Sequence, residues 1–318
     1  MRINEFFLKA TRKLYPATYK LDGQLPKEYS DTIQQNASDL IYESIMDDSP
    51  LMISRFGSTE LNCLVNYMAQ DKGFKGYVDY ITGKTNYYKW DARTLESMCT
   101  LSGFFPPSYD LLEDFSKLLI NDAWDIDILG SWLKEEVLLD KHLQNAKKVG
   151  LLNLEPYNHK IPWSRALEGK TVLVIHPFEK SIREQYKKRK LLFKDERVLP
   201  EFNLKAIKAV QSISNNQTQY RDWFEALESM KEKIDAVDYD IALIGCGAYG
   251  MPLAAHVKRT GKKAVHLGGA LQLLFGIRGK RWETEYDYGE RLMNKYWSRP
   301  LAQEIPDNAE RVERACYW

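Results

Sequence analysis

The sequence predicts an α/β fold in which a mostly parallel sheet carries helices on both faces. Short apolar, β-branched segments alternate along the chain with segments of helical periodicity, which is the pattern of repeated strand–helix units. Several of the apolar segments run directly into a glycine- or histidine-containing turn that opens a helix. The chain has 318 residues, of which 44% are hydrophobic, so it can bury a large core, and no repeat or clear linker divides it. We therefore expect residues 1–318 to form one domain.

The first half of the chain is expected to hold few strands and many helices. Residues 1–50 form a helical lead-in. Leu51–Ser54 is a short apolar strand, and the apolar periodicity after it predicts a helix over 61–68. Residues 71–145 begin with an irregular stretch rich in Gly, Tyr, Lys and Pro and continue as helix, with a strand at Ala123–Leu129. We expect this part to be an insertion that presents a binding surface.

The second half is expected to complete the sheet. Strands are predicted at Lys170–Ile175, Ile207–Gln211, Asp240–Ile244 and Lys263–Leu267, and helices at 220–234 and 251–259.

Composition excludes several classes of protein. The 45 basic and 44 acidic residues leave a net charge of +1, which gives no overall field to hold a polyanion, so no nucleic-acid partner is expected. The four cysteines lie far apart and lack the spacing of zinc ligands. The N-terminal residues do not resemble a signal peptide, and no apolar run is long enough to span a bilayer. These features predict a cytoplasmic protein.

The first segment of the chain has two interpretations. Apolar and basic residues alternate there with helical spacing: Phe6, Phe7 and Leu14 with Lys9, Arg12 and Lys13. Such a segment is either an ordinary helix packed on the domain or a basic amphipathic helix that contacts the inner face of the membrane.

A glycine-rich turn follows the strand predicted at Asp240–Ile244. Its sequence, G-C-G-A-Y-G, matches the pattern G-x-G-x-x-G between a strand and a helix, where the backbone approaches a phosphate closely. A Rossmann-type NAD site would also place an acid at the end of the next strand, but Gly268 and Gly269 follow that strand instead, so NAD is not expected. The alternatives are a phosphate or nucleotide site, and a tight packing turn without a ligand. The candidate binding residues are Gly245, Gly247, Tyr249, Gly250, Gly268 and Gly269.

A second candidate lies at the end of the strand predicted at Lys170–Ile175. Ser181 and Glu184 have the spacing of a capping box, which predicts that a helix begins at Ser181 and leaves His176 beside its N-terminus. Ligands of open α/β sheets bind at this edge. His176, Lys180 and Arg183 could therefore neutralise a diphosphate together. The alternative for the two long basic side chains is a solvated helix face.

The third candidate is the segment Arg55-Phe56-Gly57-Ser58-Thr59-Glu60, where the first strand leads into a helix. Glu60 is expected in the first turn of that helix. There its carboxylate either complements the helix dipole or faces the ligand crevice as a catalytic or metal-coordinating group. Arg55 could pair with Glu60 or with a phosphate.

The segment from Arg55 to Glu60 resembles the Arg-Phe-Gly-Asp-x-Glu segment of GT-D glycosyltransferases, which carries their Asp-x-Glu motif. The block Ile241–Gly269, an apolar strand, a glycine-rich turn, a helix and a strand ending in glycine, is similar to the late block of that family. The whole chain also resembles proteins encoded in bacterial capsule and O-antigen gene clusters. The resemblance implies a Rossmann-like GT-D fold. It also implies transfer of a sugar from a nucleotide-sugar donor, with a UDP-sugar as the expected donor, to a saccharide or lipid-linked saccharide acceptor of a surface polysaccharide.

The same resemblance assigns roles to individual residues. It makes Glu60 a catalytic candidate and places Arg55, Phe56, Gly57 and Ser58 with the donor-binding residues. His176, singled out above by its position at a strand end, is the second catalytic candidate. In this family the first acid of the motif helps to hold a divalent metal, but Ser58 stands at that position here, and a hydroxyl is a poor ligand for a hard cation. Mn²⁺ or Mg²⁺ dependence is therefore not expected, and Glu60 is the only metal-binding candidate that the motif retains.

Two further features bear on this function. The expected insertion, 71–145, is the predicted acceptor region. The tail from Gly276 combines basic and aromatic residues, which suit a sugar ring beside a phosphate but also occur as ordinary core and surface aromatics. These tail residues are Arg278, Lys280, Arg281, Trp282, Tyr286, Tyr288, Tyr296 and Trp297. A pyruvyl- or phosphoryl-type transferase of the same pathway, and a non-catalytic scaffold that binds nucleotide sugars, remain as alternatives.

Overall fold

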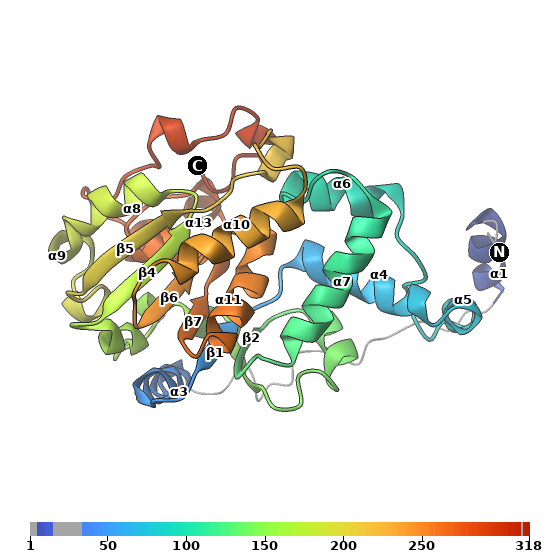
Figure 1. The fold of residues 1–318 in the computed structure, drawn as a ribbon, viewed down its shortest axis with the longest axis horizontal. Coiled ribbons are helices and arrows are strands. Elements are labelled where there is room, and N and C mark those ends of the chain that lie inside the picture. Colours follow the sequence, from blue (N-terminus) through green and yellow to red (C-terminus); the bar gives the residue numbers. More distant parts are fainter. Residues whose placement is uncertain (1–4, 15–33, 313) are drawn as a thin grey trace.

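The computed structural model describes residues 5–14, 34–312 and 314–318. Its centre is a sheet of seven strands, all of them parallel, in the order β3-β2-β1-β7-β6-β4-β5 (Figure 1). The predicted α/β class, with a Rossmann-like parallel sheet, is thus confirmed. The strands are β1 (Leu51–Ser54), β2 (Ile128–Ser131), β3 (Lys147–Gly150), β4 (Thr171–His176), β5 (Asn203–Lys208), β6 (Ile241–Ile244) and β7 (Lys263–His266).

Helices cover both faces of the sheet because the side chains of its strands are apolar on both sides. In β6 all four residues are buried, and Ala242 and Ile244 join one core cluster while Ile241 and Leu243 join the other. The first cluster lies under α4 (Ser58–Asp71), α7 (Tyr109–Ala123), α10 (Trp223–Asp235) and α11 (Gly250–Arg259).

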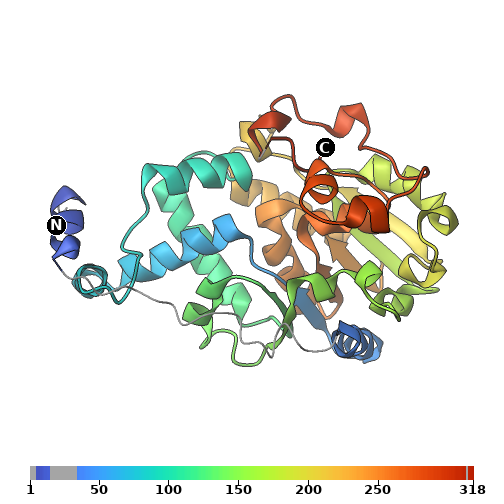
Figure 2. The same ribbon diagram turned by 180° about the vertical axis from the view of Figure 1, so that it is seen from behind.

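The second cluster lies on the opposite face of the sheet, and the helices that cover this face are toward the viewer in Figure 2. It packs under α3 (Gln34–Met46), α8 (Glu179–Tyr186), α9 (Arg189–Leu192), α12 (Leu271–Leu274), α13 (Lys280–Thr284) and α14 (Tyr288–Arg291). The C-terminal part of the chain therefore returns over this face and ends beside the carboxyl ends of the strands.

One end of the molecule projects beyond the sheet. There α1 (Glu5–Lys13) packs against α5 (Phe74–Ile81), far from the strands (Figure 1). The Arg12 guanidinium fixes this contact, since it donates hydrogen bonds of 2.6 Å to the carbonyl oxygens of Tyr80 and Thr85. Helix α6 (Ala92–Leu101) completes the helical part of the predicted acceptor region, whose strand β2 belongs to the central sheet.

Three details of the predicted elements were wrong. The strand expected at Ala123–Leu129 begins only at Ile128, because the residues before it end α7 and form a turn. The strand expected at Ile207–Gln211 is displaced, since β5 ends at Lys208. Strand β3 was not predicted, because its sequence K-K-V-G is short and half polar, as suits an edge strand.

Candidate active site

The carboxyl ends of four neighbouring strands converge on one cavity. The chain segments that follow β1, β4, β6 and β7 line a pocket of about 610 Å³. Strand β4 connects to β5 on one side through α8, whereas its neighbour β6 connects to β7 on the other side through α11, so the cavity lies at a switch point of the sheet. This is the place where open α/β sheets bind their ligands.

Most of the predicted site residues lie together in this pocket. It is lined by Arg55, Phe56, Gly57, Ser58, Glu60, His176, Gly245, Gly247, Tyr249, Gly268 and Gly269. Lys180, Arg183 and Gly250 do not line it. The three segments singled out in the sequence thus meet at one edge of the sheet, although they are far apart in the chain.

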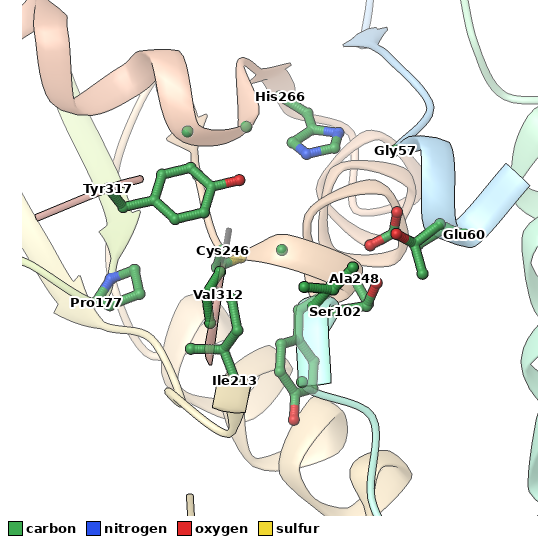
Figure 3. A pocket seen from close by; sticks show the side chains of 18 of the residues that line it. Gly57, Glu60, Ser102, Pro177, Ile213, Cys246, Ala248, His266, Val312 and Tyr317 are labelled. Atoms are coloured by element: carbon green, nitrogen blue, oxygen red, sulfur yellow. The ribbon is translucent and has the colours of Figure 1, made fainter. Parts of the chain in front are cut away.

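Glu60 occupies the first turn of α4, as predicted. Its carboxylate folds back over the start of its own helix, so that a Cβ atom on Gly57 would lie 1.8 Å from Glu60 Oε2. Figure 3 shows its oxygens directed into the cavity, across from Tyr317. From this position the carboxylate complements the helix dipole and also faces the cavity.

Arg55 supplies a half-buried positive charge to the same cavity. Its Nε atom is buried and has no hydrogen-bond partner among the described residues. Its guanidinium lies over the ring of Trp132 at 5.2 Å, and the Trp132 indole is held by a 2.9 Å hydrogen bond to the carbonyl of Phe56. Burial lowers the pKa of Arg55, while the Glu60 carboxylate opposes that shift. Because buried polar groups in folded proteins are nearly always paired, this guanidinium points to an anionic ligand.

His176 lies in the pocket but cannot serve as the predicted cation. Burial lowers its pKa to about 3, so the imidazole is neutral near pH 7. Its Nδ1 atom accepts a hydrogen bond of 2.9 Å from the backbone N–H of Phe178, which places the remaining proton on Nε2. The prediction that His176 neutralises a diphosphate is therefore wrong, because the imidazole carries no positive charge near pH 7. What remains is a neutral donor in the wall of the cavity.

The helix predicted to begin at Ser181 begins two residues earlier, and the capping box does not form. The carboxylate of Glu304 takes its place, because it accepts hydrogen bonds from the backbone N–H groups of Lys180 (2.8 Å) and Ser181 (3.1 Å) and from the Ser181 hydroxyl. A carboxylate of the chain itself thus already occupies the N-terminus of α8, where a diphosphate was expected.

The two basic residues of α8 point away from the pocket. The Arg183 guanidinium pairs with Glu179 and donates to the carbonyl of Ala206 at 2.9 Å. The Lys180 ammonium group lies 3.4 Å from Gln303 Oε1. Both side chains are exposed on the helix surface, so the interpretation as a solvated face is the one that the structure supports.

The glycine-rich turn has two separate physical roles. Gly247 has φ +58°, a conformation that other residues adopt at a cost, and it lines the pocket. Gly250 lies outside the pocket, and a Cβ atom there would come within 2.1 Å of His266 Nε2. The last glycine of the motif therefore allows α11 to pack closely against the end of β7 rather than contacting a ligand.

Several pocket residues were not predicted from the sequence. Tyr317, Trp318 and Val312 reach the cavity from the C-terminal tail, and Ser102 and Ile213 reach it from loops. No local pattern marks them, because their position depends on the path of the tail over the sheet. Two of the basic and aromatic tail residues considered in the sequence, Arg281 and Tyr286, do line the pocket. The Arg281 guanidinium lies 5.2 Å from the Tyr317 ring centre.

The two buried histidines of the site predict a dependence of stability on pH. His176 and His266 both have their pKa lowered to about 3, in each case chiefly by burial. An unfolded chain protonates these imidazoles near pH 6.5, so acid favours unfolding through them. Each should lower the unfolding free energy by up to about 1.4 kcal/mol per pH unit as the pH falls from 6 to 4. Asp122, whose pKa burial raises to about 6, acts in the opposite direction.

A comparison of variants isolates the histidine contribution. His176→Gln keeps an acceptor for the Phe178 N–H but does not titrate. Its unfolding free energy, measured with denaturant at several pH values, should fall less steeply between pH 6 and 4 than that of the parent, by about 1.4 kcal/mol per pH unit. Parallel curves for the two proteins would show that His176 is protonated in the folded state.

The motif positions of the pocket do not offer the donor set of the divalent metal that the GT-D resemblance implies. The motif positions offer one carboxylate, Glu60, and one hydroxyl, Ser58, beside the Arg55 guanidinium, and a dication prefers several carboxylate oxygens without a neighbouring cation. Among the described residues no group of three or more His, Cys, Asp and Glu side chains is placed to hold a metal ion.

The residues that carry the resemblance, from Arg55 to Glu60 and from Gly245 to Gly250, lie at one edge of the sheet. The chain as a whole matches no protein-family model, no curated protein and no solved structure.

Proposed function

We propose that this chain is a glycosyltransferase that moves a sugar from a nucleotide-sugar donor to a saccharide or lipid-linked saccharide acceptor of a bacterial surface polysaccharide. A UDP-sugar is the first donor to test. The observation that carries the proposal is the buried, unpartnered Nε of Arg55 in a cavity at the switch point of the sheet. A diphosphate would satisfy that group. The cavity, about 610 Å³, is of the size that binds small molecules and cofactors.

The reaction would be a displacement at the anomeric carbon of the donor sugar. The acceptor oxygen forms a bond to that carbon while the bond to the diphosphate oxygen breaks and the nucleoside diphosphate leaves. Glu60 takes the proton from the acceptor hydroxyl. Arg55 stabilises the negative charge on the leaving diphosphate, and His176 Nε2–H is a further donor. No step in this scheme requires a metal.

Two alternatives use the same pocket. A pyruvyl- or phosphoryl-type transferase would bind a different activated donor at Arg55. A scaffold protein would bind the nucleotide sugar without turnover. Identification of the donor separates the first alternative from the proposal, and an assay for release of the nucleoside diphosphate separates the second.

Binding of a nucleoside diphosphate is the first test. UDP at about 100 times its dissociation constant should stabilise the fold by about 2.7 kcal/mol, because it binds the folded state alone, and the melting temperature should rise accordingly. The rise should persist in EDTA, since the donor set does not fit a divalent metal. A screen of UDP, GDP, CDP and TDP at millimolar concentration, each with Mn²⁺ and with EDTA, measures both effects. Absence of any shift would contradict the proposal, and a shift that needs Mn²⁺ would contradict the metal-free site.

The paired helices α1 and α5 also support contact with the inner face of the membrane, which we propose for this cytoplasmic enzyme. Phe7, Leu14 and Phe74 are 71%, 78% and 72% exposed, which is unusual for such large apolar side chains. Lys13 and Lys75 are exposed beside them and suit anionic lipid head groups. No helix in the described parts of the chain has the length and apolar character needed to cross a bilayer.

Vesicle binding tests this contact. The protein should sediment with vesicles that contain phosphatidylglycerol and much less with phosphatidylcholine alone. Phe7→Ser with Leu14→Ser should weaken the binding at least about tenfold, because each side chain contributes about 1.5–3 kcal/mol when it is buried in an apolar phase. Leu191→Ser, a change of a 48% exposed leucine on α9 at the opposite end of the molecule, is the matched control and should bind like the parent. Equal binding by both variants would contradict the contact.

A further inference from the structure

A second hollow adjoins the pocket on the side of β5. It has a volume of about 780 Å³ and lies between the loop that follows β5 and the C-terminal segment 303–308. Val210 and Gln211 line both this hollow and the pocket, so the two spaces lie next to each other. No residue in it was singled out from the sequence.

The walls of the hollow are held in place by hydrogen bonds between segments that are distant in sequence. Gln211 Nε2 donates to the carbonyl of Glu304 at 3.2 Å, and the hydroxyl of the buried Ser214 donates to the carbonyl of Asn308 at 2.5 Å. Glu304 is itself anchored at the N-terminus of α8. The loop and the tail segment therefore form a preorganised cleft rather than two independent loops.

The backbone of this loop is strained. Ser214 has φ +64° and Asn215 has φ +58°, both in the left-handed region that disfavours side chains. Ser214 lies between a residue of the pocket, Ile213, and a residue of the hollow, Asn215. Such conformations cost about 1–3 kcal/mol each, and they gather at ligand sites, where the surrounding structure maintains them.

The chemistry of the lining is unusual for a protein surface. Of the fifteen residues that line the hollow, seven are Asn or Gln, while Lys208 and Asp307 are the only two with a formal charge. An amide offers a donor and an acceptor side by side, which matches neighbouring hydroxyls of a sugar ring, and the Tyr220 ring adds an apolar face. A strongly anionic ligand would instead require a cluster of Arg and Lys.

We propose that this hollow is the acceptor subsite and binds a neutral saccharide, whose reacting end enters the pocket past Val210 and Gln211. The proposal rests on the glycosyltransferase function proposed above. It places the acceptor between residues 208–220 and 303–308, and not on the helices of 71–145. The donor and acceptor then occupy two adjacent spaces at the carboxyl edge of the sheet.

Saturation-transfer NMR tests the subsite without turnover. The probes are maltotriose, cellotriose and N,N′-diacetylchitobiose, each added to the full-length protein without a donor. At least one should receive saturation from the protein. The double variant Gln217→Ala with Gln303→Ala should weaken its binding about tenfold, because each amide hydrogen bond contributes about 0.5–1.5 kcal/mol. Gln144→Ala, an exposed glutamine outside the hollow, should leave binding unchanged.

The outcomes separate this proposal from the function on which it rests. Absence of a saccharide signal, or a signal that the double variant retains in full, overturns the subsite. If UDP still raises the melting temperature in that case, the donor site stands and only the acceptor assignment fails. A saccharide signal that is lost in the double variant, in a protein that binds no nucleoside diphosphate, supports the subsite and contradicts the donor site.

Discussion

The Glu60→Gln variant should fold and bind UDP like the parent but turn over a nucleotide sugar about 10²–10⁴-fold more slowly. The change keeps the size of the side chain and removes the charge that would accept the acceptor proton. Glu60 faces the cavity from the first turn of α4, where its carboxylate is open to the space that a ligand would fill. Steady-state release of nucleoside diphosphate and the melting temperature, measured on the same preparation, test the prediction.

A second variant controls for the helix dipole. If Glu60 only complements the dipole of α4, its replacement should cost at most about 1 kcal/mol of stability and leave turnover nearly unchanged. Asp110→Asn removes a first-turn acid of α7 that lies outside the pocket, and it should show that behaviour. A Glu60→Gln protein that behaves like Asp110→Asn would remove Glu60 from the catalytic machinery.

The Arg55→Gln variant should lose about 10–150-fold in affinity for UDP, because hydrogen bonds to a charged group contribute about 1.5–3 kcal/mol. Its stability without ligand should change little or rise, since a buried charge without a hydrogen-bond partner at Nε is removed. A titration with UDP and a melting curve without it distinguish this pattern from simple unfolding.

Arg183→Gln is the matched control for Arg55. Both arginines were predicted from the sequence to bind the donor, yet Arg183 lies on the exposed face of α8 and pairs with Glu179. Its replacement should leave UDP affinity unchanged. The reverse result, with affinity lost in Arg183→Gln and kept in Arg55→Gln, would restore the diphosphate site originally expected at α8.

The parts of the fold that could be predicted are those encoded by local pattern. Strand β6 reads as an apolar run because it is buried on both faces, and its turn reads as glycine-rich because α11 approaches β7 closely. The rule that ligands bind at carboxyl ends of strands then placed Arg55, Glu60 and the glycine-rich turn at one edge, and the structure brings them together.

The parts that could not be predicted depend on distant residues. The capping box at Ser181 fails because Glu304, 123 residues away in the chain, supplies a carboxylate to the same N–H groups. The charge of His176 depends on burial, which the sequence motif does not encode. Tyr317 reaches the pocket only because the tail crosses the sheet, and no local sequence signal marks that path.

The pocket also has an optical property, to which the C-terminal tail contributes one of two indole rings. Of the eight tryptophans in the chain, Trp132 and Trp318 line the cavity, one beneath the Arg55 guanidinium and the other 6.4 Å from the ring of Phe178. Indole emission shifts with the polarity and charge of its surroundings, so a diphosphate that enters the pocket changes the environment of both rings. The unlabelled protein therefore contains its own fluorophores in the candidate site. We expect its tryptophan emission to report ligand entry without a dye or a coupled assay.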